Sequence, residues 1–600
     1  MAEPTSGSGI PEISAPDLQR LAENFTGIAE QSQRLVQAFI ERQAEGNFQI
    51  PDPGIVAKSF LEMTQHMLAD PRRLVEAQTS FWQNYMELLQ AASKRMTGEA
   101  PPPVIEPRPG DKRFKDEEWA ENAVFDFIKQ SYLLAARTIQ DSVSEVEGLD
   151  PKTAERVDFY TRQFVDAMAP TNFVLTNPRV LKATAESGGE NLVRGLRNML
   201  HDLERGKGQL RIKMTDLEAF ELGKNVAVTP GKVVFQNELM QLLQYTPSTE
   251  QVFTTPLLII PPWINKFYIL DLRPKNSFIK WAVDKGFTVF VISWVNPDER
   301  LAEKDFEHYL SEGTLAALGA VEQATGERQV NAAAYCIGGT LLLSTLAYMA
   351  ATGDDRIKSA TCFTTMADFE EPGELSVFID EEQLDLIDQH MEEKGYLEGT
   401  HMSGVFNMLR ANDLIWSFAI NNYLLGKDPF PFDLLFWNSD STRMPKRMHR
   451  FYLRNMYQHN RLREPGGITL LSEPIDLGKV KTPVYFLSTK EDHIAPWTST
   501  YAGTQLVGGP VKFVLGGSGH IAGVINPAGS NKYGYWTNPE LPLEPQAWLQ
   551  AATENPSSWW SDWLEWVRPN SEPLVAARTP GDGALPVLED APGSYVKIRI

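Results

Sequence analysis

The sequence predicts an α/β domain that follows a long helical region. Beyond about residue 226, short apolar runs rich in β-branched residues alternate with helical stretches, which is typical of a parallel sheet covered by helices on both faces. Before that point, apolar residues recur at helical spacing instead. The runs that we expect to be strands are 257–260, 287–294, 357–364, 484–488 and 511–515.

A chain of 600 residues is too long for one ordinary core, so we expect more than one domain. Residues 1–110 are interpreted as an N-terminal helical extension with a disordered, Gly/Pro/Ser-rich start, and 111–225 as a helical N-terminal domain. Residues 226–600 then form the α/β domain, with a mostly helical insertion at about 368–479. The expected helices lie at 17–44, 55–68, 71–96, 119–139, 151–168 and 189–204.

Composition excludes several classes of protein. The formal net charge of −22 argues against nucleic acid or an anionic membrane as the main partner. Only two cysteines occur, Cys336 and Cys362, which indicates a reducing compartment and no disulfide framework. No histidine cluster at ligand spacing accompanies them, so neither a metal nor a cofactor is expected. No signal peptide and no apolar run of about 20 residues is found, which predicts a cytoplasmic protein without a transmembrane segment.

The stretch 330–340 carries the strongest local signal. An apolar run ends at Tyr335, Cys336 follows at a sharp turn, and a helix opens on Gly338 and Gly339. This is the G-x-S-x-G pattern of the α/β-hydrolase nucleophile elbow, with cysteine in place of serine and Ala334 in place of the first glycine. The alternative is a buried cysteine that only fills space at a strand–helix junction. We expect the α/β-hydrolase fold, in which the insertion at 368–479 would be a cap.

An elbow nucleophile needs a base and an acid, which in this fold follow it along the chain after later strands. Asp492 comes just after the expected strand 484–488, and His520 just after 511–515. The neighbouring His493 is a rival for the base, and Asp492 could instead be an ordinary loop carboxylate. The order and the strand-end positions favour a Cys336–Asp492–His520 triad. Cys362 lies inside an expected strand and is assigned to the core.

Two backbone donors should complete the site as an oxyanion hole. The N–H of Ile337 follows the nucleophile, and the second donor should come from the loop 261–266. Ile264 is the preferred residue there, although Trp263 is equally well placed. A cysteine nucleophile keeps its acyl group activated as a thioester, so it favours acyl transfer over plain hydrolysis.

Several motifs together resemble the polyhydroxyalkanoate synthases, and specifically their single-subunit class I. The resemblance extends over roughly residues 110–600 and departs from the family pattern at Ala334, where glycine is usual. The motifs that carry it are 261–272 (PPWINKFYILDL), 293–297 (SWVNP), 335–340 (YCIGGT), 491–497 (EDHIAPW), 519–523 (GHIAG), 111–114 (DKRF), 127–132 (FIKQSY) and 591–597 (APGSYVK).

The resemblance implies a polyester synthase that polymerises short-chain (R)-3-hydroxyacyl-CoA, such as 3-hydroxybutyryl-CoA, and releases CoA. It implies that Cys336 carries the acyl chain, that His520 deprotonates it, and that Asp492 activates the 3-hydroxyl group rather than only orienting the histidine. It also implies a homodimer associated with polyester granules in the cytoplasm. Two alternatives stay open: a cysteine-dependent hydrolase (thioesterase or polyester depolymerase) on the same fold, and a non-catalytic granule-binding scaffold.

Two further expectations concern aromatic residues and the end of the chain. The tail 595–600 is interpreted as a possible edge strand. The aromatic residues of the insertion and of the C-terminal region are expected to pack inside the protein, with an apolar channel or dimer surface as the alternative. They are Trp416, Tyr423, Phe430, Phe432, Phe436, Trp437, Trp559, Trp560, Trp563 and Trp566.

Overall fold

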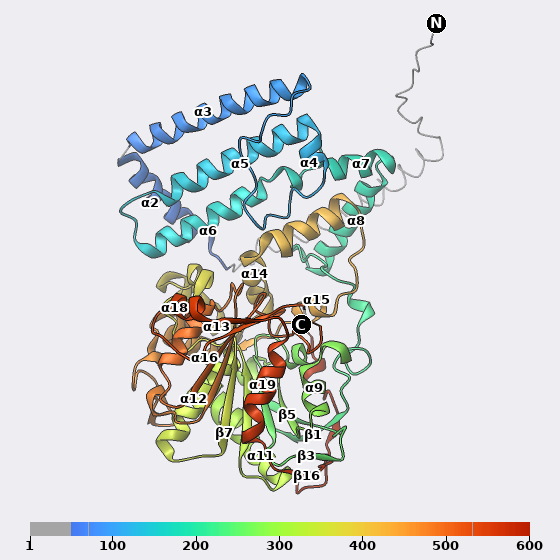
Figure 1. Ribbon diagram of the computed structural model, residues 1–600, viewed down its shortest axis with the longest axis vertical. Helices are drawn as coiled ribbons and strands as arrows, with labels where there is room; N and C mark the ends of the chain where they lie inside the picture. Colours follow the sequence, from blue (N-terminus) through green and yellow to red (C-terminus); the bar gives the residue numbers. More distant parts are fainter. Residues whose placement is uncertain (1–49, 70, 531, 600) are drawn as a thin grey trace. The chain divides into compact units, whose positions relative to one another are not determined.

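The computed structural model describes residues 50–69, 71–530 and 532–599, so the helix expected at 17–44 lies outside the described residues. The chain forms two compact units (Figure 1). The helical unit contains residues 56–216 together with 410–430. The α/β unit contains residues 50–55, 217–409 and 431–599.

Long helices build the helical unit, and their ends follow local capping rules. Asp150 accepts hydrogen bonds from the N–H groups of residues 152 and 153, and Pro151 occupies the first helical position of α6. The helix expected at 71–96 is confirmed as α3 with the same bounds. The main helices are α2 (Pro53–Ala69), α3 (Pro71–Met96), α5 (Ala123–Ser144), α6 (Pro151–Ala167), α7 (Pro178–Glu186) and α8 (Glu190–Arg205).

Residues 410–430 come from the insertion between strands but pack on α8. Their segments η8 (Asn412–Trp416) and η9 (Ala419–Leu424) are π-helical. A Cβ atom at Gly195 would lie 1.7 Å from the carbonyl oxygen of Tyr423, so glycine is required where η9 meets α8. The hydroxyl of Tyr423 also donates to Asp202 at 2.7 Å. The segment 410–430 is therefore an integral part of the helical unit.

The α/β unit is organised around an eleven-stranded mixed sheet in the order β15-β14-β13-β12-β7-β6-β4-β5-β2-β1-β17. The six strands from β13 to β5 are parallel, and the flanking strands are antiparallel. All five expected strand runs are strands of this sheet. The bounds are β1 (Gly231–Gln236), β2 (Met240–Tyr245), β4 (Leu257–Ile260), β5 (Val289–Trp294), β6 (Val330–Tyr335), β7 (Ile357–Phe363), β12 (Val484–Thr489), β13 (Val511–Gly516), β14 (Tyr535–Thr537), β15 (Thr553–Asn555) and β17 (Glu589–Asp590).

Aromatic side chains fill the core on one face of this sheet. Helices α9 (Phe278–Asp284) and α19 (Trp559–Val567) lie side by side there (Figure 1). Trp559, Trp560 and Trp563 are at most 1% exposed, and their indole N–H groups donate to acceptors on neighbouring segments. Packing inside the protein is thus confirmed for these tryptophans. Phe430 is different, because it is 80% exposed.

The end of the chain corrects one expectation. Residues Tyr595–Lys597 form a short 3-10 turn, and the edge strand is instead β17, which pairs with β1. The tail leaves the sheet because Lys266, a buried lysine, needs acceptors: its Nζ donates to the carbonyl oxygens of Val596 and Ile598, each at 2.8 Å.

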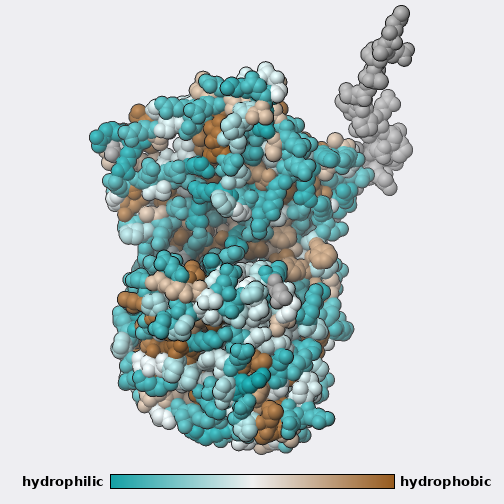
Figure 2. Space-filling model, in the orientation of Figure 1, coloured by the Kyte–Doolittle hydropathy of each residue, from teal (hydrophilic) through white to brown (hydrophobic). Residues whose placement is uncertain are grey.

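Hydrophilic side chains predominate on the face drawn in Figure 2, with smaller hydrophobic patches between them. No helix in the described part of the chain is long and apolar enough to cross a bilayer.

Candidate active site

Cys336 lies at the turn between β6 and α12 (Ile337–Thr352), with φ 54° and ψ −123°. A positive φ is uncommon for a residue other than glycine and marks a strained turn. The N–H of Cys336 donates to the carbonyl oxygen of Phe363 on β7 at 2.8 Å, which holds the turn in place. The side chain is half-buried. This is the conformation expected of a nucleophile elbow.

Two glycines let α12 begin close to the neighbouring strands. A Cβ atom at Gly338 would lie 2.5 Å from the carbonyl oxygen of Ile260, at the end of β4. A Cβ atom at Gly339 would lie 1.9 Å from Oγ1 of Thr365, just beyond β7. Both distances are far inside van der Waals contact, so no larger residue fits without movement of the backbone or of Thr365. The close packing brings the loop after β4 next to the elbow.

Asp492 and His520 lie on loops at the same edge of the sheet as Cys336. His520 Nδ1 and Asp492 Oδ2 are 2.7 Å apart. The other carboxylate oxygen of Asp492 accepts the N–H groups of Ile494 and Ala495, both at 2.9 Å. The side chain of Asp492 is 0% exposed and that of His520 is 9% exposed. The carboxylate is therefore held by the protein on both oxygens and directs one of them to His520.

The electrostatic surroundings of His520 favour its protonated form. Burial lowers the pKa of His520, but the charges of Asp492 and Cys336, together with hydrogen bonds to both side chains, outweigh this effect and raise the pKa to about 10. His520 thus interacts with Asp492 on one side and with Cys336 on the other. The arrangement can hold a proton between a thiol and an imidazole.

The two rival residues differ in their surroundings. The imidazole that bonds the carboxylate of Asp492 at 2.7 Å is that of His520. Cys362 is fully buried in β7, and burial raises the pKa of its thiol. The structure therefore brings together Cys336, Asp492 and His520, and it keeps Cys362 in the core.

The residues predicted to supply the oxyanion donors lie at the start of α12 and in the loop after β4. Ile337 is the first residue of α12, where an N–H group has no intrahelical acceptor. Ile264 lies in the loop after β4, and its carbonyl oxygen is bonded by the N–H of Thr442 at 3.1 Å. The indole of Trp263 is buried among aromatic rings, with the ring centroid of Tyr309 at 4.6 Å. These contacts fix the loop but do not distinguish the N–H of Ile264 from that of Trp263 as the second donor.

Two tyrosines near Cys336 were not found by sequence reasoning. Tyr452 is the last residue of α16 (Lys446–Tyr452), and Tyr457 lies in η10 (Leu453–Gln458). Their ring centroids are 5.7 Å apart. Burial raises the pKa of both phenols, and the nearby charge of Cys336 adds to the effect. They belong to the insertion, where no motif marks which side chains face the elbow.

A buried ion pair supports the loop after β4. Lys266 Nζ lies 2.7 Å from Asp440 Oδ1, and the two side chains are only 2% and 1% exposed. The hydroxyl of Tyr268 donates to the other carboxylate oxygen of Asp440 at 2.8 Å. Lys266 also binds the tail carbonyls described above, so the candidate oxyanion loop and the end of the chain share one anchor.

Comparisons with known proteins identify the family and the fold. A family model described as the N-terminus of poly-beta-hydroxybutyrate polymerase (PhaC) matches residues 110–282, and a model of the alpha/beta hydrolase fold matches residues 256–527. The expected α/β-hydrolase fold is thereby confirmed.

Among curated proteins, the poly(3-hydroxyalkanoate) polymerase of Methylorubrum extorquens is 50% identical over 598 residues, which is 98% of each chain. The poly(3-hydroxyalkanoate) polymerase subunit PhaC of Rhizobium meliloti is 49% identical and covers 97% of this chain and 96% of its own. The corresponding subunit of Cupriavidus necator is 42% identical over 88% of this chain and 89% of its own. The chain therefore belongs to the poly(3-hydroxyalkanoate) polymerase family.

Proposed function

We propose that this chain is a polyhydroxyalkanoate synthase that joins (R)-3-hydroxyacyl groups from CoA thioesters into a polyester and releases CoA. The observation that carries the proposal is a cysteine at a strained elbow, within reach of a histidine that a buried carboxylate orients, in a chain of this family. The length and the helical N-terminal region favour short-chain substrates such as 3-hydroxybutyryl-CoA.

In the first step, Sγ of Cys336 attacks the thioester carbonyl carbon while His520 holds the thiol proton. The negative charge that develops on the carbonyl oxygen is stabilised by the N–H of Ile337 and a donor from loop 261–266. When the tetrahedral intermediate collapses, the C–S bond to CoA breaks and the CoA sulfur takes the proton from His520. The acyl group is then a thioester on Cys336.

In the second step, the 3-hydroxyl oxygen of another hydroxyacyl-CoA attacks the carbonyl carbon of the thioester on Cys336. An ester bond forms as the C–S bond to Cys336 breaks, and the released thiolate can be acylated again by the lengthened acyl-CoA as in the first step. The hydroxyl proton must go to a base, for which either His520 or Asp492 is a candidate. Asp492 has no exposed side-chain surface and bonds protein donors on both oxygens. This environment favours a role for Asp492 in orienting His520, which would then serve as the base in both steps.

The decisive experiment follows purified protein with (R)-3-hydroxybutyryl-CoA in quenched samples. Free CoA is measured by thiol titration and polyester by solvent extraction, with Cys336→Ala as the control. We expect CoA release matched by extractable polyester and absent from the variant. Release of CoA with only soluble 3-hydroxybutyrate would support a cysteine hydrolase instead. Absence of CoA release from this and longer acyl-CoAs, together with no alkylation of Cys336, would favour a non-catalytic scaffold.

The role of Asp492 is tested with Asp492→Asn under single-turnover conditions. If Asp492 orients His520, the first release of CoA and the later elongation slow together. A retained stoichiometric burst of CoA followed by no polymer would instead assign Asp492 to activation of the hydroxyl group.

We also propose that the enzyme acts in the cytoplasm at the surface of its polyester granule. Apolar residues on one face of α3 are exposed: Val75 by 61%, Trp82 by 59%, Met86 by 53%, Leu89 by 40% and Met96 by 70%. Their spacing of 7, 4, 3 and 7 residues forms a continuous helical stripe, and exposed apolar stripes mark contact surfaces.

Granule binding is tested by sedimentation with purified polyester particles. Trp82→Glu combined with Met86→Glu should leave the protein in the supernatant, whereas the control Glu87→Gln should sediment like the unmodified chain. Unchanged sedimentation of the double variant would exclude α3 as the contact.

A homodimer, which the sequence resemblance implies, is tested by light scattering with and without substrate.

A further inference from the structure

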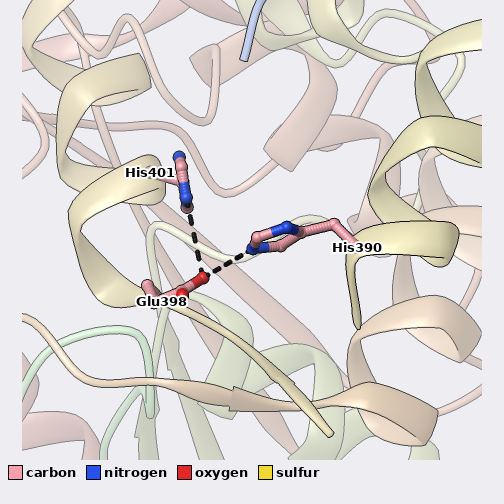
Figure 3. A group of neighbouring side chains, drawn as sticks. All are labelled: His390, Glu398 and His401. Atoms are coloured by element: carbon pink, nitrogen blue, oxygen red, sulfur yellow. Dashed lines mark hydrogen bonds and ion pairs between the residues drawn. The ribbon is translucent and has the colours of Figure 1, made fainter. Parts of the chain in front are cut away.

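A second group of side chains in the α/β unit has no part in the proposed reaction. His390 lies in α13 (Glu381–Lys394), Glu398 precedes α14 (Gly399–Leu409), and His401 lies in the first turn of α14. Figure 3 shows both imidazole rings directed at one oxygen of the Glu398 carboxylate. The three residues therefore join the end of one helix to the start of the next.

The distances suit a metal ion. Glu398 Oε2 lies 2.8 Å from His390 Nε2 and 3.6 Å from His401 Nε2. Metal–ligand bonds of about 2.0–2.1 Å in a tetrahedral zinc site separate neighbouring ligand atoms by about 3.3 Å. The two measured separations bracket this value, and all three ligand atoms lie within 4.8 Å of one another.

The directions and the burial of the three side chains also suit a metal ion. The two imidazole rings meet at an interplanar angle of 82° with centroids 5.5 Å apart, so they approach from different directions rather than stacking. The side chains are 10%, 22% and 17% exposed for His390, Glu398 and His401, which shelters the group but leaves it open to an ion from solvent. Such a site leaves a fourth position for water.

Lys394 is the positive charge that approaches this group most directly. Its ammonium contacts Oε1 of Glu398, whereas the two histidine distances given above are to Oε2. Oε2 of Glu398 therefore remains directed at the two histidines. Two imidazoles and a carboxylate are a donor set that Zn²⁺ prefers.

We propose that His390 Nε2, His401 Nε2 and Glu398 Oε2 bind a divalent transition-metal ion, with Zn²⁺ as the best fit and water as the fourth ligand. The ion links α13, one turn before its end, to the N-terminal turn of α14. It is separate from the chemistry at Cys336 and acts by joining two helices of the insertion.

The test is a zinc titration of the full-length chain, carried on a tag without histidine and stripped with a chelator. Every protein in it also has Cys336→Ala, because a cysteine beside His520 and Asp492 could bind zinc by itself. Isothermal titration with ZnCl₂ should show one equivalent bound with a rise in the thermal unfolding midpoint. His401→Ala should weaken binding by at least about 100-fold, since loss of a ligand should cost no less than loss of a supporting group.

Two controls make the result specific. Lys394→Ala removes the neighbouring charge but no ligand, so it should retain the zinc equivalent, and His459→Ala removes a histidine outside the group and should also retain it. Co²⁺ added to the chain with all three ligands intact should give the visible absorption of a tetrahedral site, and Zn²⁺ should abolish it. Equal zinc affinity in His401→Ala, or no such cobalt spectrum, would overturn the proposal.

Discussion

The hydroxyl of Tyr335 donates a 2.8 Å hydrogen bond to the carbonyl oxygen of His520, so the residue directly before Cys336 holds the loop that carries the histidine. The two rings are also in contact, with centroids 5.6 Å apart. The elbow and the histidine loop are thus fixed to each other by backbone and side chain together.

Tyr335→Phe should lower the rate of CoA release while leaving the fold intact. The ring stays in place, but a buried carbonyl oxygen loses its donor, which costs about 1–3 kcal/mol and loosens the position of His520. We expect a fall in kcat of roughly 10-fold or more. Tyr485→Phe is the matched control, because it removes a similar bond to Asp562 near the opposite end of β12. Equal rates for the two variants would contradict a positioning role for Tyr335.

The native protein should react with a small alkylating agent at one cysteine. The chain has two cysteines, and only Cys336 has accessible surface, while burial raises the pKa of Cys362 and keeps it protonated. Mass spectrometry after iodoacetamide treatment should show one adduct on the folded protein and two after denaturation. His520→Gln should slow the native reaction by roughly 10-fold or more, because a nearby imidazolium favours the thiolate. Two adducts on the folded chain would contradict the burial of Cys362.

Stability should depend on pH through His520. Its pKa is raised from 6.5 to about 10 in the folded state, so the protonated ring contributes stability that is complete below pH 6.5 and is lost as the pH rises through about 10. Asp492→Asn removes the largest favourable charge while burial remains, so the pKa of His520 should fall steeply. Thermal unfolding between pH 6 and 10.5 should therefore be less pH-dependent in that variant. If the unfolding midpoints of the two proteins change with pH in the same way, the pKa of His520 is not raised by Asp492.

Gly338→Ala should destabilise the protein and abolish activity. The new Cβ would lie 2.5 Å from a backbone oxygen of Ile260, and backbone cannot yield as a flexible side chain does. Gly319→Ala in α11 (Ala316–Thr325) is the control, since its Cβ would meet nothing within 4 Å. That control should be stabilised by up to about 1 kcal/mol through helix propensity. Thermal unfolding and CoA release are measured for both variants. Similar unfolding midpoints and similar rates of CoA release would show that α12 can move away from β4.

Lys266→Met should be strongly destabilising, by about 3 kcal/mol, because it removes the nearer cation of the buried Asp440 carboxylate and leaves only Arg599, whose Nε lies 3.5 Å from it. The double variant Lys266→Met/Asp440→Asn should recover part of this loss, because the uncompensated charge is gone. Chemical unfolding of the unmodified chain, the two single variants and the double variant forms the required cycle. If the losses in the free energy of unfolding from the two substitutions simply add, the two side chains do not act as a pair.

Much of the fold could be predicted because strands and elbows have local signals. The five apolar runs became strands of one sheet, and the residues at the ends of β6, β12 and β13 meet because parallel strands share one edge. The positions of Cys336, Asp492 and His520 follow from that rule, whereas their catalytic roles remain predictions.

Other features depend on contacts between distant segments, which carry no local pattern. The approach of Tyr452 and Tyr457 to Cys336 is set by the irregular π-helical insertion. The departure of the tail from the sheet is decided by Lys266, some 330 residues earlier in the chain. The group of His390, Glu398 and His401 was not predicted, because His390 lies eight residues before Glu398 and only the helix and the turn after it bring the three side chains together.

The bonds from Lys266 to the carbonyl oxygens of Val596 and Ile598 have a consequence for proteolysis. A cut just before Tyr595 would remove both acceptors and leave Nζ of Lys266 with the carboxylate of Asp440. Cleavage there should therefore loosen loop 261–266 beside the elbow, although no residue of the candidate site is cut.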